Sequence, residues 1–259
     1  MKITRTVVPG LFTTLNIFCG FLSIIYTSQG QFSLAAWVII LAAIFDSLDG
    51  IMARMTRSSS QFGVELDSLA DVVSFGAAPS FLVYQVYLRT MIEPWGILIA
   101  ALPVVLGAIR LARFNVQLIG FDKDYFNGLP IPMQAITMCA FILQFSEELT
   151  DTNSFAGIAM IVLVVILSLL MVSHVKYDTM PKLSKLQLKS HPWKFIVVFV
   201  ALLIVVFSKL FLDNNYLFLM LMLYVIFGII RAVVIFVKKI FIRTEDEPIK
   251  AGKLSSIDI

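Results

Sequence analysis

Eight apolar stretches of about 20 residues follow one another along this chain, separated by short polar segments. A helix of about 20 apolar residues crosses the hydrocarbon core of a bilayer. Such a chain must satisfy its backbone hydrogen bonds internally, and stretches of this length do so as helices. Only 14% of the 259 residues are charged, against about a quarter in a soluble domain. The sequence therefore predicts an all-α, polytopic membrane helix bundle. The stretches cover about residues 8–28, 33–53, 64–88, 94–115, 130–147, 154–175, 193–212 and 216–239.

Lysines and arginines gather at one end of the predicted helices. They lie before the first stretch, after the second, fourth and sixth stretches, and in the tail that follows the eighth. The opposite connections carry Arg89 and Lys209, together with acids such as Glu147 and Asp151. Cytoplasmic loops of membrane proteins are enriched in lysine and arginine. We therefore expect the basic end, with both chain termini, to face the cytoplasm.

Four aspartates lie where the second stretch ends and the third begins, which is the predicted cytoplasmic end. On a helix, Asp46 and Asp49 share one face at i, i+3, and Asp67 and Asp71 share a face at i, i+4. Two neighbouring antiparallel helices would bring all four together. Carboxylates in a membrane segment are costly and mark functional sites, and their mutual repulsion is relieved by divalent cations. The cluster predicts Mg²⁺ or Mn²⁺ ligands, and four carboxylates suit two ions.

Small residues and one arginine accompany the aspartates. Gly50 and Ala53 leave room on the same helix face, and Gly63, which we expect to open the third helix, does likewise. Arg54 adds a fixed positive charge whose donors match phosphate oxygens. Together with bound metal at headgroup depth, these residues point to a phosphate-bearing substrate.

The complete pattern Asp-x2-Asp-Gly-x2-Ala-Arg-x8-Gly-x3-Asp-x3-Asp runs without a gap from Asp46 to Asp71. It resembles the signature of the CDP-alcohol phosphotransferase family. The resemblance implies a homodimeric enzyme with a six-helix membrane core and a divalent metal pair. It also implies transfer of a phosphatidyl or similar group from a CDP-linked lipid to an alcohol, with release of CMP.

Roles for individual residues follow from the same resemblance. The metal ligands would be Asp46, Asp49, Asp67 and Asp71. Asp71 would also act as general base, taking the proton of the incoming hydroxyl in a direct attack. The CDP-lipid contacts would be Thr13, Asn16, Gly50, Ala53, Arg54, Ser60 and Gly63.

Four segments, one of which overlaps the motif, are similar to the bacterial and archaeal phosphatidylserine synthase branch of the family. They span residues 13–20, 62–71, 110–115 and 128–132. This implies CDP-diacylglycerol and L-serine as substrates, in a bacterial or archaeal cytoplasmic membrane. Because serine carries a carboxylate, its pocket needs a fixed cation. The hypothetical serine-binding residues are Arg110, Arg113, Asn115 and Lys182.

Several alternatives stay open at this point. The basic residues after the fourth and sixth stretches could anchor the protein to lipid headgroups. A sister enzyme that accepts glycerol 3-phosphate or an inositol phosphate would need more cationic groups around its pocket. A cation transporter would spread its acids through the membrane depth, and a regulatory lipid-binding protein would not need Asp71 once metal and lipid are held.

The chain divides into three parts by this interpretation. Residues 1–190 would form the transmembrane core, 191–242 an additional helix pair with a packing or dimer role, and 243–259 a cytoplasmic tail. The expected partners are the two substrates, membrane lipids and a second copy of the chain, with no nucleic acid.

Overall fold

The computed structural model describes residues 7–56, 61–117, 125–151, 154–173, 175–178, 217–231 and 234. Its long helices are α1 (Val7–Ser28), α2 (Phe32–Thr56), α5 (Trp95–Gln117), α6 (Ile131–Gln144) and α7 (Phe155–Val172). Between α2 and α5 the chain forms α3 (Gln61–Asp71), the π-helical turn η1 (Val72–Ala77), α4 (Ala78–Val86) and the 3-10 turn η2 (Leu88–Thr90). A second 3-10 turn, η3 (Glu148–Thr150), precedes α7, and a further helix covers Leu217–Arg231.

The prediction of an all-α membrane bundle is confirmed. Five helical segments in the described residues are long and apolar enough to cross a membrane, and Ile131–Gln144 and Leu217–Arg231 are shorter apolar helices. The predicted stretch at 193–212 lies outside the described residues. Two short strands that we did not predict, β1 (Tyr125–Asn127) and β2 (Lys176–Asp178), pair antiparallel beside the bundle.

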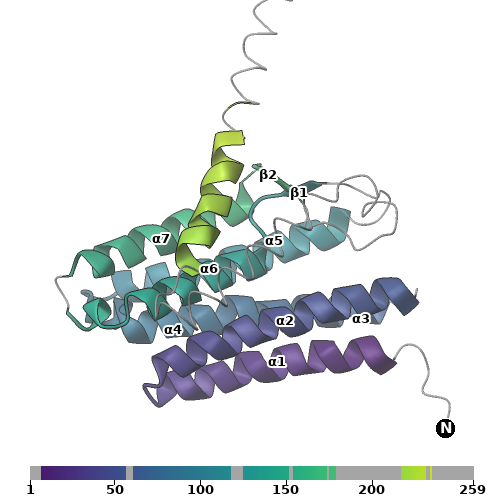
Figure 1. Cartoon of the computed structure of the whole chain (residues 1–259), viewed down its shortest axis with the longest axis horizontal. Helices are drawn as coiled ribbons and strands as arrows, with labels where there is room; N and C mark the ends of the chain where they lie inside the picture. Colours follow the sequence, from purple (N-terminus) through teal and green to yellow (C-terminus); the bar gives the residue numbers. More distant parts are fainter. Residues whose placement is uncertain are drawn as a thin grey trace, which may run out of the picture.

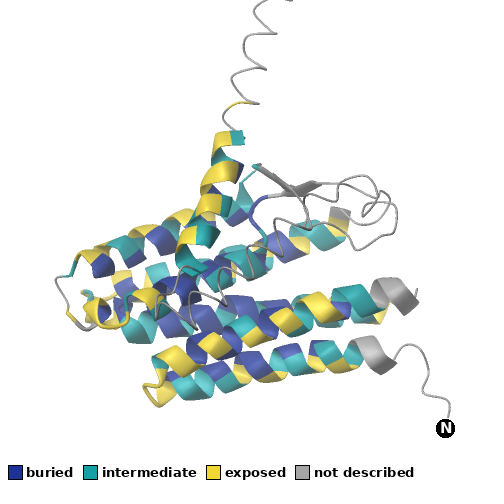
Figure 2. Ribbon diagram, in the orientation of Figure 1, coloured by how far each residue is buried: buried dark blue, intermediate teal, exposed yellow. Residues whose placement is uncertain are grey.

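Helices α1 and α2 pack along each other, as do α5 and α7, and the continuous segment α3–η1–α4 contacts α1, α2, α5 and α6 (Figure 1). This segment is the central one, since 56% of its apolar window is buried inside the protein, against 33–44% for the other spans. Buried residues lie where helices face one another (Figure 2). The outward faces are apolar: on α2, Leu34, Trp37, Leu41, Ile44 and Leu48 recur at helical spacing and are exposed, which is typical of a lipid-facing surface.

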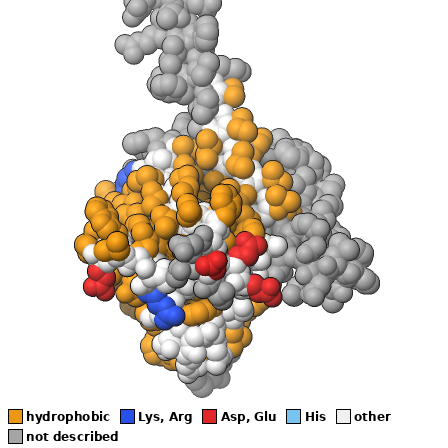
Figure 3. Space-filling model, turned by 90° about the vertical axis from the view of Figure 1, so that its left-hand side faces the viewer, with side chains coloured by type: hydrophobic (Ala, Val, Ile, Leu, Met, Phe, Trp, Pro, Cys, Tyr) orange, Lys and Arg blue, Asp and Glu red, His pale blue; other side chains and the backbone are white. Residues whose placement is uncertain are grey.

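The two ends of the bundle differ in their charged residues. Figure 3 looks onto the end that carries the α1–α2, α4–α5 and α6–α7 connections, with hydrophobic side chains covering much of the surface around a few charged ones. The motif aspartates lie towards the other end, where α2 finishes and α3 begins. The connections on that side are the ones rich in lysine and arginine in the sequence.

The π-helical turn η1 follows Asp71 directly and has an identifiable cause. Pro79 lies in the first turn of α4, where its ring has no N–H and would clash with the carbonyl four residues earlier in a regular α-helix. The backbone instead widens, so that the N–H of Ala78 donates to the carbonyl of Val73, five residues back. The turn changes the helix phase between the aspartates of α3 and the core residues of α4.

Gly20 allows α1 and η1 to approach closely. A Cβ atom at Gly20 would overlap Ser74, including its backbone Cα at 2.7 Å. Ser74 itself is fully buried and donates its hydroxyl to the carbonyl of Asn16 (2.8 Å). The absence of a side chain at Gly20 therefore fixes the distance between α1 and the segment that carries Asp71.

Substituting Gly20→Ala should destabilise the fold, because backbone rather than a flexible side chain blocks the added methyl group. Overpacking of this kind costs about 1–3 kcal/mol, which thermal unfolding in detergent should register as a lower Tm. Gly10→Ala is the matched control, since a Cβ there meets nothing within 4 Å and alanine is the better helix former. An unchanged Tm for Gly20→Ala would contradict the close packing of α1 on η1.

Candidate active site

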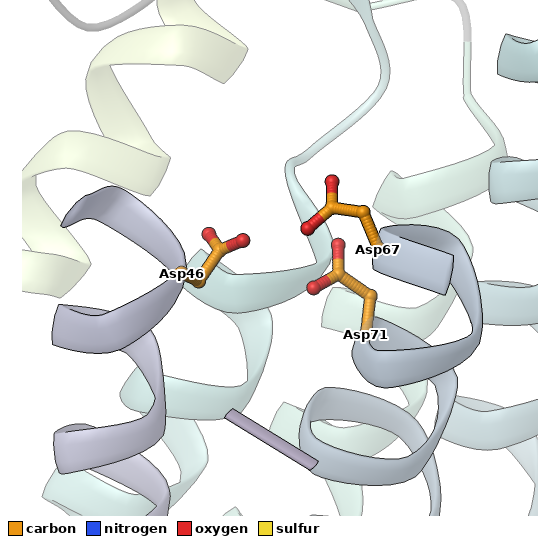
Figure 4. Close-up of side chains that lie close together, drawn as sticks. All are labelled: Asp46, Asp67 and Asp71. Atoms are coloured by element: carbon orange, nitrogen blue, oxygen red, sulfur yellow. The ribbon is translucent and has the colours of Figure 1, made fainter. Parts of the chain in front are cut away.

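Three carboxylates from two helices converge in the described structure. Asp46 projects from α2, and Asp67 and Asp71 project from successive turns of α3 towards it (Figure 4). Each offers an oxygen to a group whose members all lie within 4.8 Å of one another. Asp71 is buried, and Asp46 and Asp67 are half-buried. The structure therefore brings together the two helix faces that the sequence spacing indicated.

Asp49 lies one turn beyond Asp46 on α2 and is not a member of that group. It is 8% exposed, and its Oδ2 accepts a hydrogen bond from the hydroxyl of Thr13 at 2.9 Å. Its Oδ1 is buried and has no hydrogen-bond partner among the described residues. A buried carboxylate oxygen without a donor is a candidate for a cation, so a ligand role for Asp49 stays a prediction.

The donor set fits a hard divalent cation. Two ionised carboxylates about 5 Å apart repel each other by roughly 3 kcal/mol at an effective dielectric constant of 20, and Asp46, Asp67 and Asp71 make three such pairs. Mg²⁺ and Mn²⁺ prefer carboxylate oxygens to nitrogen or sulfur. The cluster can hold a metal, and a bound cation would remove the repulsion that the helices alone must otherwise resist.

Thr13 and Asn16 of α1 contact the aspartates. Both are buried in the structure, and the side-chain amide of Asn16 donates to Oδ1 of Asp71 at 3.5 Å. The resemblance had implied CDP-lipid contacts for these two residues. In the structure, the side chain of Thr13 contacts Asp49 and that of Asn16 contacts Asp71.

The hypothetical serine-binding residues fall into distinct environments. Arg110 on α5 is 6% exposed and interacts electrostatically with Asp71, Arg113 and Tyr224. Arg113 donates from Nη1 to the carbonyl of Val172 at the end of α7 (3.1 Å). Arg110 is thus the cation that adjoins the cluster, whereas Arg113 has a clear structural contact.

Asn115 ties the end of α5 to α3. Its amide donates to the hydroxyl of Ser68 at 2.9 Å, and Ser68 donates in turn to the carbonyl of Val64 at 3.1 Å. Because Ser68 adjoins Asp67, this bridge fixes α5 against the helix that carries the two aspartates.

The remaining predicted residues are placed only in part. Gly50 follows Asp49 on α2, and Gly63 lies in the first turn of α3, which begins at Gln61 rather than at Gly63 as expected. Ala53 and Arg54 belong to α2, with side chains outside the described part of the protein. Ser60 and Lys182 lie outside the described residues.

Three further residues lie near the site, and we did not predict them from the sequence: Ser68, Ser74 and Tyr224. Ser74 follows Asp67 and Asp71 at the spacing of one helix face, a signal that could have been read. Tyr224 lies on helix Leu217–Arg231, which packs on α6 through Phe218 and Phe141, with ring centroids 5.1 Å apart. Nothing in the sequence indicated that this distant helix would reach Arg110.

The fold is a helical membrane bundle, and a partly buried carboxylate cluster lies near one of its ends. A membrane protein of this class can bind a divalent metal at that end. The model of the CDP-alcohol phosphatidyltransferase family matches residues 6–172, which include every described residue of the cluster and of its α1 and α5 partners. The chain belongs to this family.

Similar proteins come from both bacteria and archaea. The CDP-diacylglycerol–serine O-phosphatidyltransferase of Helicobacter pylori strain J99 is 40% identical over 238 residues, which cover 90% of this chain and 94% of the relative. The archaetidylserine synthase of Methanothermobacter thermautotrophicus is 38% identical over 179 residues, 68% of this chain and 72% of the relative. The Bacillus subtilis CDP-diacylglycerol–serine O-phosphatidyltransferase is 35% identical over 187 residues, 72% of this chain and 98% of the relative.

Asp67→Asn should weaken Mn²⁺ binding to the purified protein by at least about tenfold, because a neutral amide replaces one of a few charged ligands. Glu65→Gln is the matched control, since Glu65 is an exposed carboxylate on the same helix. Titration with Mn²⁺, followed by electron paramagnetic resonance of the free ion, measures both. Equal affinity in Asp67→Asn and Glu65→Gln would contradict a metal role for the cluster.

Proposed function

We propose that this protein is a phosphatidylserine synthase, which transfers the phosphatidyl group of CDP-diacylglycerol to the hydroxyl of L-serine and releases CMP. The observation that carries the proposal is the convergence of Asp46, Asp67 and Asp71 beside a buried arginine, Arg110. Family membership supports phosphatidyl transfer from a CDP-linked donor. The names of the bacterial relatives support serine as the acceptor.

The reaction is a single displacement at the phosphorus atom that carries the diacylglycerol. The serine oxygen forms a bond to this phosphorus, the bond between phosphorus and the CMP oxygen breaks, and the hydroxyl proton passes to a carboxylate. Asp71 is our candidate for that base, since it lies in the cluster, accepts a hydrogen bond from Asn16 and interacts electrostatically with Arg110. General bases act through such positioned contacts.

We assign Asp46, Asp49, Asp67 and Asp71 to a site for Mg²⁺ or Mn²⁺, with room in the ligand count for two ions. A bound divalent cation would neutralise the diphosphate and stabilise CMP as the leaving group. Arg54, from its place in the motif, would bind phosphate oxygens, and Gly50, Ala53, Ser60 and Gly63 would line the path of the CDP-lipid.

Arg110 is the best candidate for the group that binds the serine carboxylate. It is buried on α5 beside Asp71, so a carboxylate bound there would hold the serine hydroxyl near the proposed base. Charge-assisted hydrogen bonds to a carboxylate are about twice as strong as neutral ones. Arg113 and Asn115 would support the pocket through their contacts to α7 and α3.

The distribution of basic residues supports a site and chain termini that face the cytoplasm. Serine and CMP, which are water-soluble, would enter and leave the site on that side.

The resemblance also favours a homodimer. From the positions of the apolar stretches, we propose a core of residues 1–190, an added helix pair at 191–242 and a tail at 243–259.

A direct assay separates the family from the acceptor. Purified protein in mixed micelles with CDP-diacylglycerol and Mn²⁺ or Mg²⁺ is offered serine, glycerol 3-phosphate or an inositol phosphate, and CMP is quantified. We expect CMP release only when serine is the alcohol offered. Chelation of the metal or the substitution Asp71→Asn should abolish this CMP release. CMP with glycerol 3-phosphate but not with serine would overturn the acceptor, and no CMP with any of the alcohols would overturn the enzyme.

Arg110→Ala should raise the KM for serine roughly tenfold to a hundredfold, as expected for loss of a hydrogen bond to a charged group. The KM for CDP-diacylglycerol should change much less. Arg113→Ala is the matched control, because Arg113 lies on the same helix but contacts α7. It should lower the Tm, and it should raise the KM for serine less than Arg110→Ala does. Equal rises in both KM values for Arg110→Ala would argue against a serine contact.

A further inference from the structure

Helix α1 presents a buried polar face to the rest of the bundle. Thr13, Asn16, Ser23 and Thr27 recur at intervals of three, seven and four residues along one side and are all between 0% and 3% exposed. Buried polar groups in a membrane helix are costly unless they are hydrogen-bonded or functional. The two members near the start of α1 face the aspartates, and Ser23 instead donates to the carbonyl of Ala35 (3.0 Å).

Thr13 holds Asp49 in one orientation. Its hydroxyl donates to Oδ2 at 2.9 Å, which is within the distance range of hydroxyl hydrogen bonds. The other oxygen of Asp49, Oδ1, is left without a partner among the described residues. Because Oδ2 is hydrogen-bonded to α1, Oδ1 is the oxygen of Asp49 that can bind a cation. Asp49 also interacts electrostatically with Asp46.

Asn16 makes a longer contact to Asp71, and its backbone is linked to η1 by a hydrogen bond. Its Nδ2 lies 3.5 Å from Oδ1 of Asp71, and an ionised carboxylate only accepts, so the amide presents its N–H to it. Its backbone carbonyl accepts the Ser74 hydroxyl at 2.8 Å. Ser74 lies three residues after Asp71, so one turn of the chain is linked to α1 twice.

We propose that Thr13 and Asn16 are positioning residues for the aspartates, with Thr13 orienting Asp49 and Asn16 orienting Asp71. The first turns of α1 thereby become part of the proposed metal centre rather than only a wall of the CDP-lipid pocket. The close contact of Gly20 with Ser74 fixes α1 at the distance that these hydrogen bonds require. Outer partners of metal ligands contribute a tenfold to hundredfold range in metal affinity in other proteins.

This inference rests on the proposed function only for its kinetic readout, because metal binding is measured without either substrate. Thr13→Val removes the hydroxyl and keeps the shape, and we expect about tenfold weaker Mn²⁺ binding by electron paramagnetic resonance. Thr13→Ser should restore it. Ser23→Ala is the control, because it removes a buried hydroxyl from the same face away from the aspartates, and its Mn²⁺ affinity should equal that of the wild type.

The kinetic arm distinguishes positioning from lipid contact. At saturating Mn²⁺, Thr13→Val should have a KM for CDP-diacylglycerol close to that of the wild type. Unchanged Mn²⁺ affinity with a raised KM would overturn the inference and make Thr13 a lipid contact. If Thr13→Val does not fold, Asn16→Ala and Thr13→Ala carry the same comparison, and wild-type Mn²⁺ affinity in them would overturn it. Failure of the wild-type protein to release CMP although it binds Mn²⁺ would count against the proposed function and leave this inference standing.

Discussion

Mutual repulsion among carboxylates is the constraint that the packing of this bundle must overcome. Asp46, Asp67 and Asp71 lie within 4.8 Å of one another through their nearest oxygens, in surroundings that screen charge poorly. In the described structure, the side-chain amide of Asn16 from α1 and the positive charge of Arg110 from α5 both act on Asp71 and oppose this repulsion. A divalent cation bound between these carboxylates would neutralise the remaining repulsion.

Apolar packing supplies the rigidity that holds these like charges together. The segment α3–η1–α4 is the most buried of the spans, and Phe75 and Leu82, which follow the aspartates on it, are fully buried. Gly20 lets α1 approach this segment, and the π-helical turn that Pro79 imposes sets the phase between Asp71 and the core. The backbone positions of Asp67 and Asp71 are therefore set by the most buried segment of the bundle.

The sequence predicted the spans and the aspartate faces because both depend on local spacing. Apolar length set the helices, and intervals of three and four residues placed each aspartate pair on one face. Contacts between distant segments could not be predicted in this way. The bonds of Thr13 to Asp49, of Arg113 to the end of α7 and of Asn115 to Ser68 join residues 36, 59 and 47 positions apart. The position of Tyr224 likewise follows from tertiary packing, whereas the π-helical turn has a local cause in Pro79 that we did not predict.

The central claim is that α2 and α3 hold a divalent metal between their aspartates while α1 orients two of them. Anomalous diffraction from crystals of the protein grown with Mn²⁺ tests it most directly. We predict an anomalous peak within bonding distance of carboxylate oxygens of Asp46, Asp67 and Asp71, with Asp49 turned towards it by Thr13. A manganese peak elsewhere, or none between these side chains at saturating Mn²⁺, would contradict the account.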